Sequence, residues 1–197
     1  MNRLIHSMWI GEIKVITGIR RCGKSVLLFD LFFEYLLSQN VSEDHILKIE
    51  LDQRRYYKFR NPITLCEYVE STVRDRKDEK FYLFIDEVQF TTKVVDKENG
   101  GIEVTIYDMF IDEVQYAISN KELKNLDEVK LYNVLNGLLR LRNVDIYVTG
   151  SNSKGLSKDI ATEFRGRATQ IHVFPLSFAE FYSAVGGDEQ KALGYFE

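Results

Sequence analysis

The sequence is short of cysteine and of long apolar runs, and each shortage excludes a class of protein. Its only cysteines are Cys22 and Cys66, which are too few for a disulfide framework and favour a reducing, cytoplasmic setting. No apolar run approaches membrane-spanning length, so we expect no membrane segment. Residues 1–7 also lack the apolar centre of a signal peptide.

Histidine and net positive charge are scarce as well. The three histidines, His6, His45 and His172, stand singly and without the spacing of a metal site. A formal net charge of −4 gives no support for a broad nucleic-acid surface, although it is compatible with a local basic groove. What remains is an ordinary globular composition, 45% hydrophobic and 28% charged, over 197 residues, which suits one α/β domain.

The clearest motif is G-I-R-R-C-G-K-S at residues 18–25, a complete G-x-x-x-x-G-K-[ST] phosphate loop. The β-branched run before it, residues 13–17, predicts a strand, and the apolar run from Val26 to Leu37 predicts a buried helix. Strand, glycine-rich turn and helix together are the context in which this motif binds phosphate.

The chemistry of the loop assigns roles to its residues. Gly18 and Gly23 let successive N–H groups point at phosphate oxygens, and the helix dipole adds to that field. Lys24 is expected to reach the β- and γ-phosphates, and Ser25 to place its hydroxyl on Mg²⁺. The predicted nucleotide-binding residues of this segment are Gly18, Arg20, Arg21, Cys22, Gly23, Lys24, Ser25 and Val26.

A second motif follows the apolar run F-Y-L-F-I at residues 81–85, which is typical of a strand buried on both faces of a parallel sheet. That strand delivers Asp86 and Glu87 at its carboxyl end, where ligands bind in open α/β sheets. We expect Asp86 to hold the Mg²⁺ and Glu87 to orient and polarise the attacking water.

The hexapeptide F-I-D-E-V-Q occurs twice, at residues 84–89 and 110–115, so Glu113 is a rival for the catalytic position. Asp108 argues against the second copy, because it would put a charge into a buried central strand. The second copy also fits a helix with its apolar residues on one face. Between the copies, residues 93–107 contain Asn99-Gly100-Gly101 between β-prone runs and predict a hairpin.

The remaining pattern completes an alternating α/β chain. Further strands are expected at residues 45–51, 144–149 and 170–174, with helices from 62, over 131–141 and from 177. Ser151 and Asn152 follow one of these strands and are candidates for sensing the γ-phosphate, although an ordinary Asn/Ser turn is the alternative. Arg165-Gly166-Arg167 precede the last expected strand and fit a solvated turn.

These segments together resemble the bacterial and archaeal AAA-type P-loop ATPases that carry a C-terminal nuclease-like domain of unknown function. The resemblance rests on G-I-R-R-C-G-K-S, F-I-D-E-V-Q, V-D-I-Y-V-T-G-S-N-S-K, E-F-R-G-R and F-P-L-S-F-A-E-F-Y. It implies a three-layer α/β core of the additional-strand class, with a central parallel sheet ordered 5-1-4-3-2. It also implies ATP and Mg²⁺ as ligands, Asp86 and Glu87 as the Walker B pair, and a sensor at Ser151–Asn152. The resemblance further implies Arg165 or Arg167 as a candidate arginine finger, which would act on a neighbouring subunit of a homo-oligomer, against the alternative of a solvated turn.

The resemblance also divides the chain. An ATPase core is expected over residues 1–185, with a hairpin and helix insertion at about 91–120, and residues 186–197 would begin the C-terminal region. The predicted activity is hydrolysis of ATP to ADP and phosphate, in which Lys24, Glu87, Asn152, Arg165 and Arg167 act. One alternative is a nucleotide-gated binding module, in which ATP binding rather than hydrolysis switches a surface for a partner protein, for the missing C-terminal domain or for DNA. The other is a truncated fragment that folds poorly.

Overall fold

Five parallel strands form the centre of the computed structural model, which describes residues 1–92, 94–96, 127–150, 164, 166–184 and 186. The strands are β1 (Ile13–Thr17), β2 (Ile46–Glu50), β3 (Phe81–Asp86), β6 (Val144–Gly150) and β7 (Ala168–His172). Their order across the sheet is β2-β3-β6-β1-β7, with every neighbouring pair parallel. Numbered one to five along the chain, this is the predicted order 5-1-4-3-2 seen from the opposite edge.

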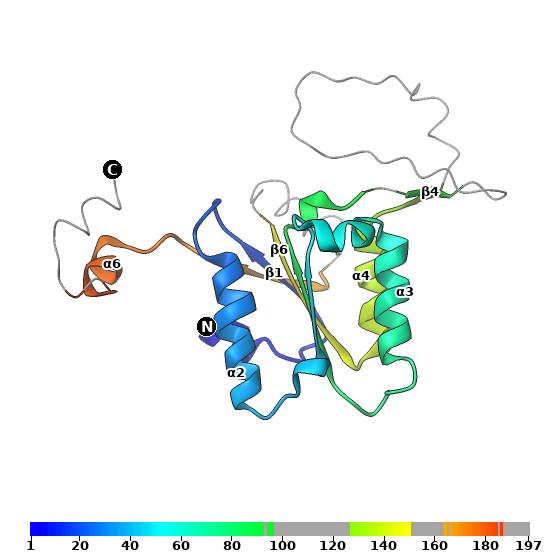
Figure 1. Cartoon of the computed structure of the whole chain (residues 1–197), viewed down its shortest axis with the longest axis horizontal. Coiled ribbons are helices and arrows are strands. Elements are labelled where there is room, and N and C mark those ends of the chain that lie inside the picture. The colour runs from blue at the N-terminus through cyan, green and yellow to red at the C-terminus, as the bar shows by residue number, and fades with distance from the viewer. Residues whose placement is uncertain (93, 97–126, 151–163, 165, 185, 187–197) are drawn as a thin grey trace, which may run out of the picture.

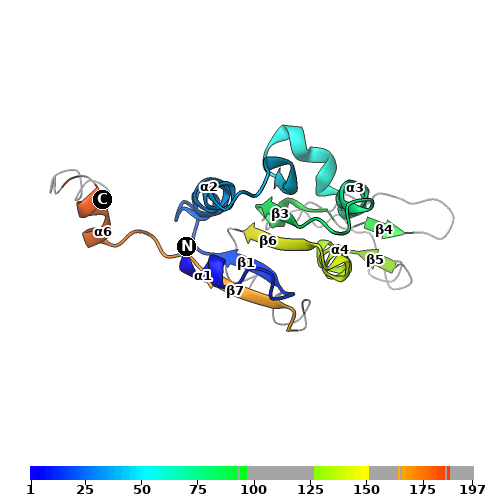
Figure 2. The same ribbon diagram turned by 90° about the horizontal axis from the view of Figure 1, so that it is seen from below.

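Helices cover both faces of this sheet, because the strands alternate apolar side chains between two cores. One core joins Ile16, Phe84 and Tyr147 to α1 (Asn2–His6), the π-helical turn η1 (Val26–Phe32) and α2 (Phe33–Ser38). The other joins Val15, Ile85 and Val148 to α3 (Pro62–Val73) and α4 (Leu131–Leu138). In Figure 1, α2 stands on one side of the sheet and α3 and α4 on the other; Figure 2 shows the layers from below.

Helix starts follow the local capping chemistry that the sequence predicts. Asn61 caps α3 by accepting a hydrogen bond from the Ile63 N–H at 2.9 Å, and Pro62 occupies the first helical turn. Ser177 caps α6 (Phe178–Ala184): its hydroxyl donates to Glu180 at 2.7 Å and accepts from the Glu180 N–H at 3.3 Å. Both predicted helix starts are confirmed.

Several boundaries differ from the predicted ones. The helix after the phosphate loop is π-helical over Val26–Phe32 before it becomes α-helical, a departure that apolar periodicity does not reveal. β7 lies two residues earlier than predicted, because it pairs residue for residue with β1 from Ala168 opposite Ile13. The helix α1 was not predicted at all. Short 3₁₀ turns complete the described connections: η2 (Glu43–His45), η3 (Arg54–Arg60), η4 (Val88–Phe90) and η6 (Leu139–Leu141).

A two-stranded ribbon lies outside the main sheet. Its strands are β4 (Val94–Asp96) and β5 (Asp127–Val129), which pair antiparallel. Of the hairpin predicted over residues 93–107, the structure describes only β4, and the partner of β4 comes from beyond residue 126. The second F-I-D-E-V-Q copy lies outside the described residues.

All five parallel strands end at the same edge of the sheet, uppermost in Figure 1. The phosphate loop, Glu87 and the connection that leaves β7 therefore meet there. Beyond β7, the chain runs out past the sheet to α6, which lies apart from the two helical layers in both views. None of the described helices combines the length and the apolar character needed to cross a membrane.

Candidate functional site

The phosphate loop turns away from β1 at a point that admits no side chain. A Cβ on Gly18 would lie 2.4 Å from the carbonyl oxygen of Val173 and 2.6 Å from Sγ of Cys22. Further along, Arg21 has φ +66° and Gly23 has φ +90°. These left-handed conformations curl the loop back on itself, which is how a glycine-rich turn directs its N–H groups inward.

Lys24 folds into this curl. Its side chain is only 4% exposed, and its ammonium group donates hydrogen bonds to the carbonyl oxygens of Gly18 at 3.2 Å and Ile19 at 3.0 Å. A buried cation bonded only to neutral carbonyls has no counter-charge within the loop, and an anion at this position would supply one. The geometry therefore suits a phosphate group.

Ser25 and Asp86 lie against each other although 61 residues separate them. The Ser25 hydroxyl donates to Oδ2 of Asp86 at 2.7 Å, and the Thr149 hydroxyl, at the end of β6, donates to Oδ1. A hydroxyl and a carboxylate supply hard oxygen ligands, the type that Mg²⁺ prefers. Where Mg²⁺ binds together with substrate phosphates, one or two protein ligands usually suffice. The pair therefore fits a magnesium ion whose other ligands would be phosphate and water. Across the described residues, no cluster of three His, Cys, Asp or Glu forms a separate metal site.

Glu87 is held in an unusual backbone conformation just after β3. Its φ and ψ are both 54°, the left-handed region, which non-glycine residues adopt mainly where surrounding contacts enforce it. Those contacts are hydrogen bonds from the Glu87 N–H to Oδ1 of Asp86 at 3.1 Å and to Oγ1 of Thr149 at 3.3 Å. The Gln89 amide donates to Oε2 of Glu87. The half-buried carboxylate is thus positioned beside Asp86 at the carboxyl edge.

The other predicted loop residues lie at or near the surface. Arg20 and Arg21 are exposed, Cys22 is half-buried, and Val26 is 52% exposed. Ser151, Asn152 and Arg165 lie outside the described residues.

Arg167 lies far from the phosphate loop of its own chain. Its carbonyl oxygen accepts a hydrogen bond from the Ile13 N–H at 2.9 Å, which places it at the amino end of β1. From there to Gly18 is about 16 Å along the strand, farther than an arginine side chain extends.

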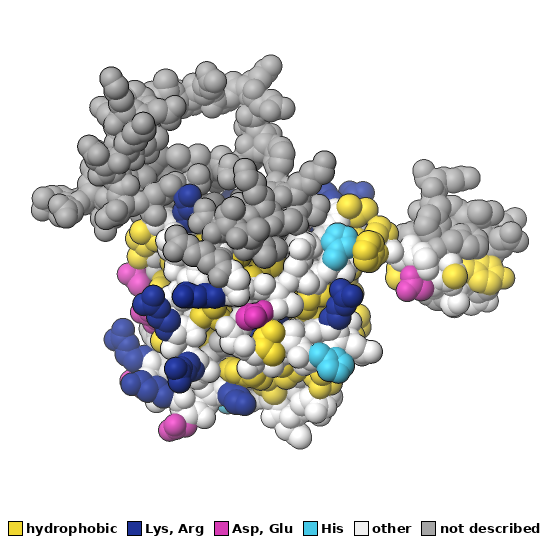
Figure 3. Space-filling model, turned by 180° about the vertical axis from the view of Figure 1, so that it is seen from behind, with side chains coloured by type: hydrophobic (Ala, Val, Ile, Leu, Met, Phe, Trp, Pro, Cys, Tyr) yellow, Lys and Arg dark blue, Asp and Glu magenta, His cyan; other side chains and the backbone are white. Residues whose placement is uncertain are grey.

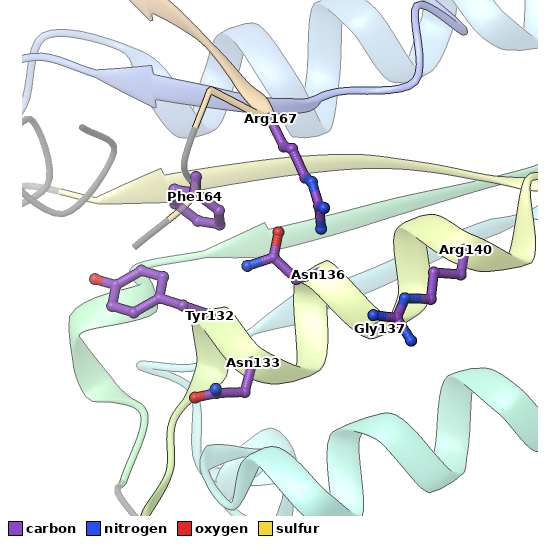
Figure 4. A pocket seen from close by; sticks show the side chains of 7 residues that line it. All are labelled: Tyr132, Asn133, Asn136, Gly137, Arg140, Phe164 and Arg167. Atoms are coloured by element: carbon purple, nitrogen blue, oxygen red, sulfur yellow. The ribbon is translucent and has the colours of Figure 1, made fainter. Parts of the chain in front are cut away.

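Arg167 instead lines a pocket of about 440 Å³ beside α4 (Figure 4). The aromatic rings of Tyr132 and Phe164 meet edge to face there, with centroids 5.0 Å apart, and Arg140 opens onto the same pocket. No carboxylate of the described residues pairs with Arg140 or Arg167. The pocket therefore presents two uncompensated guanidinium groups at the side of the molecule.

Two features of this edge escaped prediction from the sequence. Thr149, predicted only as the last residue of a strand, contacts both acidic residues. His172, predicted as an ordinary residue, lies beside the start of the phosphate loop, with Nδ1 3.1 Å from Oγ1 of Thr17. The sequence signal available for both was their position at a strand's carboxyl end.

Comparison with known proteins identifies a family and two relatives that match most of this chain. An AAA domain family, AAA_14, matches residues 11–105 and 97–182. An uncharacterized protein of Haemophilus influenzae is 30% identical over 193 residues, 98% of this chain and 38% of that protein. An uncharacterized protein of Methanocaldococcus jannaschii is 27% identical over 187 residues, 92% of this chain and 31% of that protein. The chain thus spans well under half the length of these two relatives.

A solved structure supports the fold. PCH-2 of C. elegans superposes with a TM-score of 0.50 at 15% identity, over 99% of this chain and 43% of that one. At this identity the likeness concerns the fold alone. The family match spans residues 11–182, and with it the loop at 18–25, the acidic pair at 86–87 and the strands that carry them. The resemblance drawn from the motifs is therefore confirmed, and the chain belongs to the AAA domain family of P-loop ATPases.

Proposed function

We propose that this chain binds ATP with Mg²⁺ at the loop Gly18–Ser25 and hydrolyses it to ADP and phosphate. The observation that carries the proposal is the 2.7 Å contact between the Ser25 hydroxyl and Asp86, with the buried ammonium of Lys24 one residue away. Cation, hydroxyl and carboxylate meet where the loop begins its helix, which is the arrangement a Mg²⁺-bound triphosphate requires.

Binding follows from groups already directed at the loop. The N–H groups of the curl and the Lys24 ammonium would hold the β- and γ-phosphates, replacing the hydrogen bonds to the Gly18 and Ile19 carbonyls. Ser25 and Asp86 would hold Mg²⁺, which when bound neutralises charge on the phosphate oxygens. Thr149 keeps the Asp86 carboxylate turned toward Ser25 by donating to its other oxygen.

Hydrolysis is assigned to Glu87. Its carboxylate would accept a hydrogen bond from the attacking water and orient that water toward the γ-phosphate. The left-handed backbone and the amide of Gln89 hold the carboxylate in place. Ser151 or Asn152, which follow β6, remain our candidates for sensing the γ-phosphate.

The arginine finger is assigned to Arg165 or Arg167 and requires a second copy of the chain. Because Arg167 lies at the amino end of β1, it cannot reach its own loop. In a homo-oligomer, it would have to act on the nucleotide of a neighbouring copy. An arginine supplied in this way raises phosphoryl-transfer rates by about 10³–10⁵. We therefore expect slow turnover at low protein concentration and faster turnover on assembly.

The test combines ATP binding with phosphate release from the same preparation. Lys24→Ala should abolish binding, and Glu87→Gln should keep binding but lose release. Glu113→Gln is the matched control, because it changes the same residue in the second F-I-D-E-V-Q copy and should leave both readouts unchanged. Normal release from Glu87→Gln together with loss in Glu113→Gln would transfer the catalytic role to the second copy.

A second candidate is a nucleotide-gated binding module. It is favoured by the length of the two relatives, because this chain covers only 38% and 31% of them and they contain further sequence on which a nucleotide-gated core could act. In that reading, residues 1–185 form the ATPase core with an insertion at about 91–120, residues 186–197 begin a C-terminal region, and binding rather than hydrolysis switches a surface for another domain or partner protein. Tight Mg²⁺–ATP binding without Glu87-dependent release would favour this candidate.

A further inference from the structure

The acidic pair fixes which way a nucleotide would lie along the loop. Ser25, Asp86 and Glu87 place the γ-phosphate end toward β3, on one side of β1. The nucleoside at the other end of the triphosphate then extends toward the opposite neighbour of β1, which is β7. This direction rests on the proposed function, since it takes the loop as the phosphate site.

On the β7 side, the chain presents an aromatic ring to solvent. Phe174 is 74% exposed, the highest fraction among the large hydrophobic side chains of the described residues. It lies close to the loop, because Val173 contacts Gly18 and the Val173 N–H donates to the Thr17 carbonyl at 2.7 Å. Ile19, 57% exposed, adds apolar surface on the loop itself. Figure 3 shows hydrophobic and histidine side chains side by side where the chain leaves toward α6.

This ring is braced despite its exposure. The imidazole of His172 meets it edge to face, with ring centroids 4.4 Å apart and an interplanar angle of 73°. His172 is anchored in turn by Oγ1 of Thr17 at 3.1 Å, and the Gln170 amide donates to the same oxygen at 2.9 Å. Thr17 is the last residue before the loop, so the brace joins the ring to the phosphate site. An aromatic ring held in advance loses little entropy when a ligand stacks on it.

We propose that Phe174 is the stacking platform for the base of the bound nucleotide and that His172 positions it. A large exposed apolar ring beside a phosphate site gains by covering one face with another flat ring. Aromatic stacking tolerates every base, because each has a π-face. Phe174 therefore raises affinity for ATP and GTP alike, while the phosphates are held by the loop.

The deciding experiment separates the base from the phosphates. Mg²⁺–ATP and Mg²⁺–tripolyphosphate, which has no base, are titrated against wild type, Phe174→Ala and Leu176→Ala. Phe174→Ala should weaken ATP binding by about 5- to 150-fold, the range of one base–aromatic stack, and leave tripolyphosphate binding unchanged. Leu176→Ala is the matched control, since Leu176 is also exposed, at 46%, but lies two residues farther from the loop. It should alter neither affinity.

A second readout reports contact directly. Trp9 is the only tryptophan of the chain, so Phe174→Trp adds one reporter to a known background. That variant should keep ATP affinity and show an emission change on adding ATP or GTP, but none with tripolyphosphate and none in wild type. His172→Ala should weaken ATP binding less than Phe174→Ala does and should blunt the emission change in the Phe174→Trp background.

The outcomes separate the two proposals. If wild type binds neither ATP nor tripolyphosphate, the proposed function fails and this inference fails with it. If wild type binds both and Phe174→Ala binds ATP as tightly as wild type, only the inference is overturned. Equal losses of ATP and tripolyphosphate binding in Phe174→Ala would also overturn it, because they would indicate a distorted loop.

Discussion

Asp145 and Lys14 form an ion pair in the middle of the sheet, and removing the carboxylate should be costly in a predictable way. Lys14 on β1 is fully buried and Asp145 on β6 is 3% exposed; the Lys14 ammonium donates to Oδ1 of Asp145. Oδ2 accepts from the Tyr147 hydroxyl at 2.7 Å and from the Trp9 N–H at 3.1 Å. Asp145→Asn keeps the shape but removes the carboxylate that pairs with the lysine, so that only the weaker attraction of Glu12 remains.

The free energy of unfolding that Asp145→Asn can lose is limited by the cost of deprotonating Lys14. Burial lowers the pKa of Lys14, and Asp145 opposes that lowering, so the variant's lysine should lose its proton in the folded state. Deprotonating a lysine of ordinary pKa at pH 7 costs about 4.6 kcal/mol, which is the ceiling. Broken buried pairs cost about 3–5 kcal/mol, close to that ceiling. With about 2 kcal/mol per molar urea as the slope, the unfolding midpoint should fall by about 2 M.

The pH dependence of stability tests whether Lys14 loses its proton in the folded variant. A lysine neutral in the folded variant and charged when unfolded binds more protons in the unfolded state, so the variant's stability rises with pH up to the unfolded pKa. At pH 9.5 the ceiling has shrunk to about 1.2 kcal/mol. Tyr147 does not interfere, because burial raises the pKa of its hydroxyl well above its ordinary value. Urea unfolding at pH 7 and pH 9.5, with Lys14→Met/Asp145→Asn as control, measures this directly.

The reasoning is refuted by either of two results. A midpoint for Asp145→Asn unchanged at pH 7 would mean that the carboxylate does not sustain the lysine's charge. A loss of equal size at both pH values would attribute it to packing or to the hydrogen bonds of Tyr147 and Trp9. The double variant should be more stable at pH 7 than Asp145→Asn, because no charge is left buried.

Two further predictions concern Gly18 and Thr149 at the site, and a third compares Cys66 on α3 with Cys22 in the loop. Gly18→Ala should destabilise the fold by about 1–3 kcal/mol through overpacking against Val173 and should weaken ATP binding, measured by thermal melting and titration. Burial raises the pKa of the Cys66 thiol to about 11, so at pH 8 Cys66 should be alkylated about a hundredfold more slowly than an ordinary thiol. Bound ATP should slow the alkylation of Cys22, which lies in the phosphate loop. Mass spectrometry after timed labelling measures both rates. Thr149→Val should lower phosphate release about 5- to 150-fold with a smaller effect on ATP affinity, because about 1–3 kcal/mol of carboxylate positioning is lost.

The strands of the sheet could be predicted because each one is indicated by the apolar pattern of its own segment. Phe81–Asp86 is buried throughout, as its apolar run predicted, and the order of strands came from the motif resemblance. One criterion proved weaker than expected: Asp108 counted against a central strand, yet Asp145 occupies one because Lys14 on the neighbouring strand faces it. Such compensation depends on pairing between strands more than a hundred residues apart, which a single sequence does not display.

The residues of the site likewise fall into those that the sequence predicts and those that depend on how the strands pair. The loop is contiguous in the chain, and the contact between Ser25 and Asp86 follows from two strands ending at one edge. The positions of Thr149 and His172 depend instead on the lateral neighbours of β3 and β1 and on the register between them. Side chains that act across a sheet become visible only once the strands are aligned.

The ribbon of β4 and β5 has a consequence for how this chain can change in length. Asp96 and Asp127 pair across this ribbon, where neighbouring strands lie about 4.8 Å apart, although 30 residues intervene between them in the sequence. Closing such a stretch costs only about 1.6 kcal/mol more in chain entropy than closing one of five residues. The chain-entropy cost therefore changes little with the length of the segment between β4 and β5, so that length can vary while the sheet and the phosphate loop stay the same.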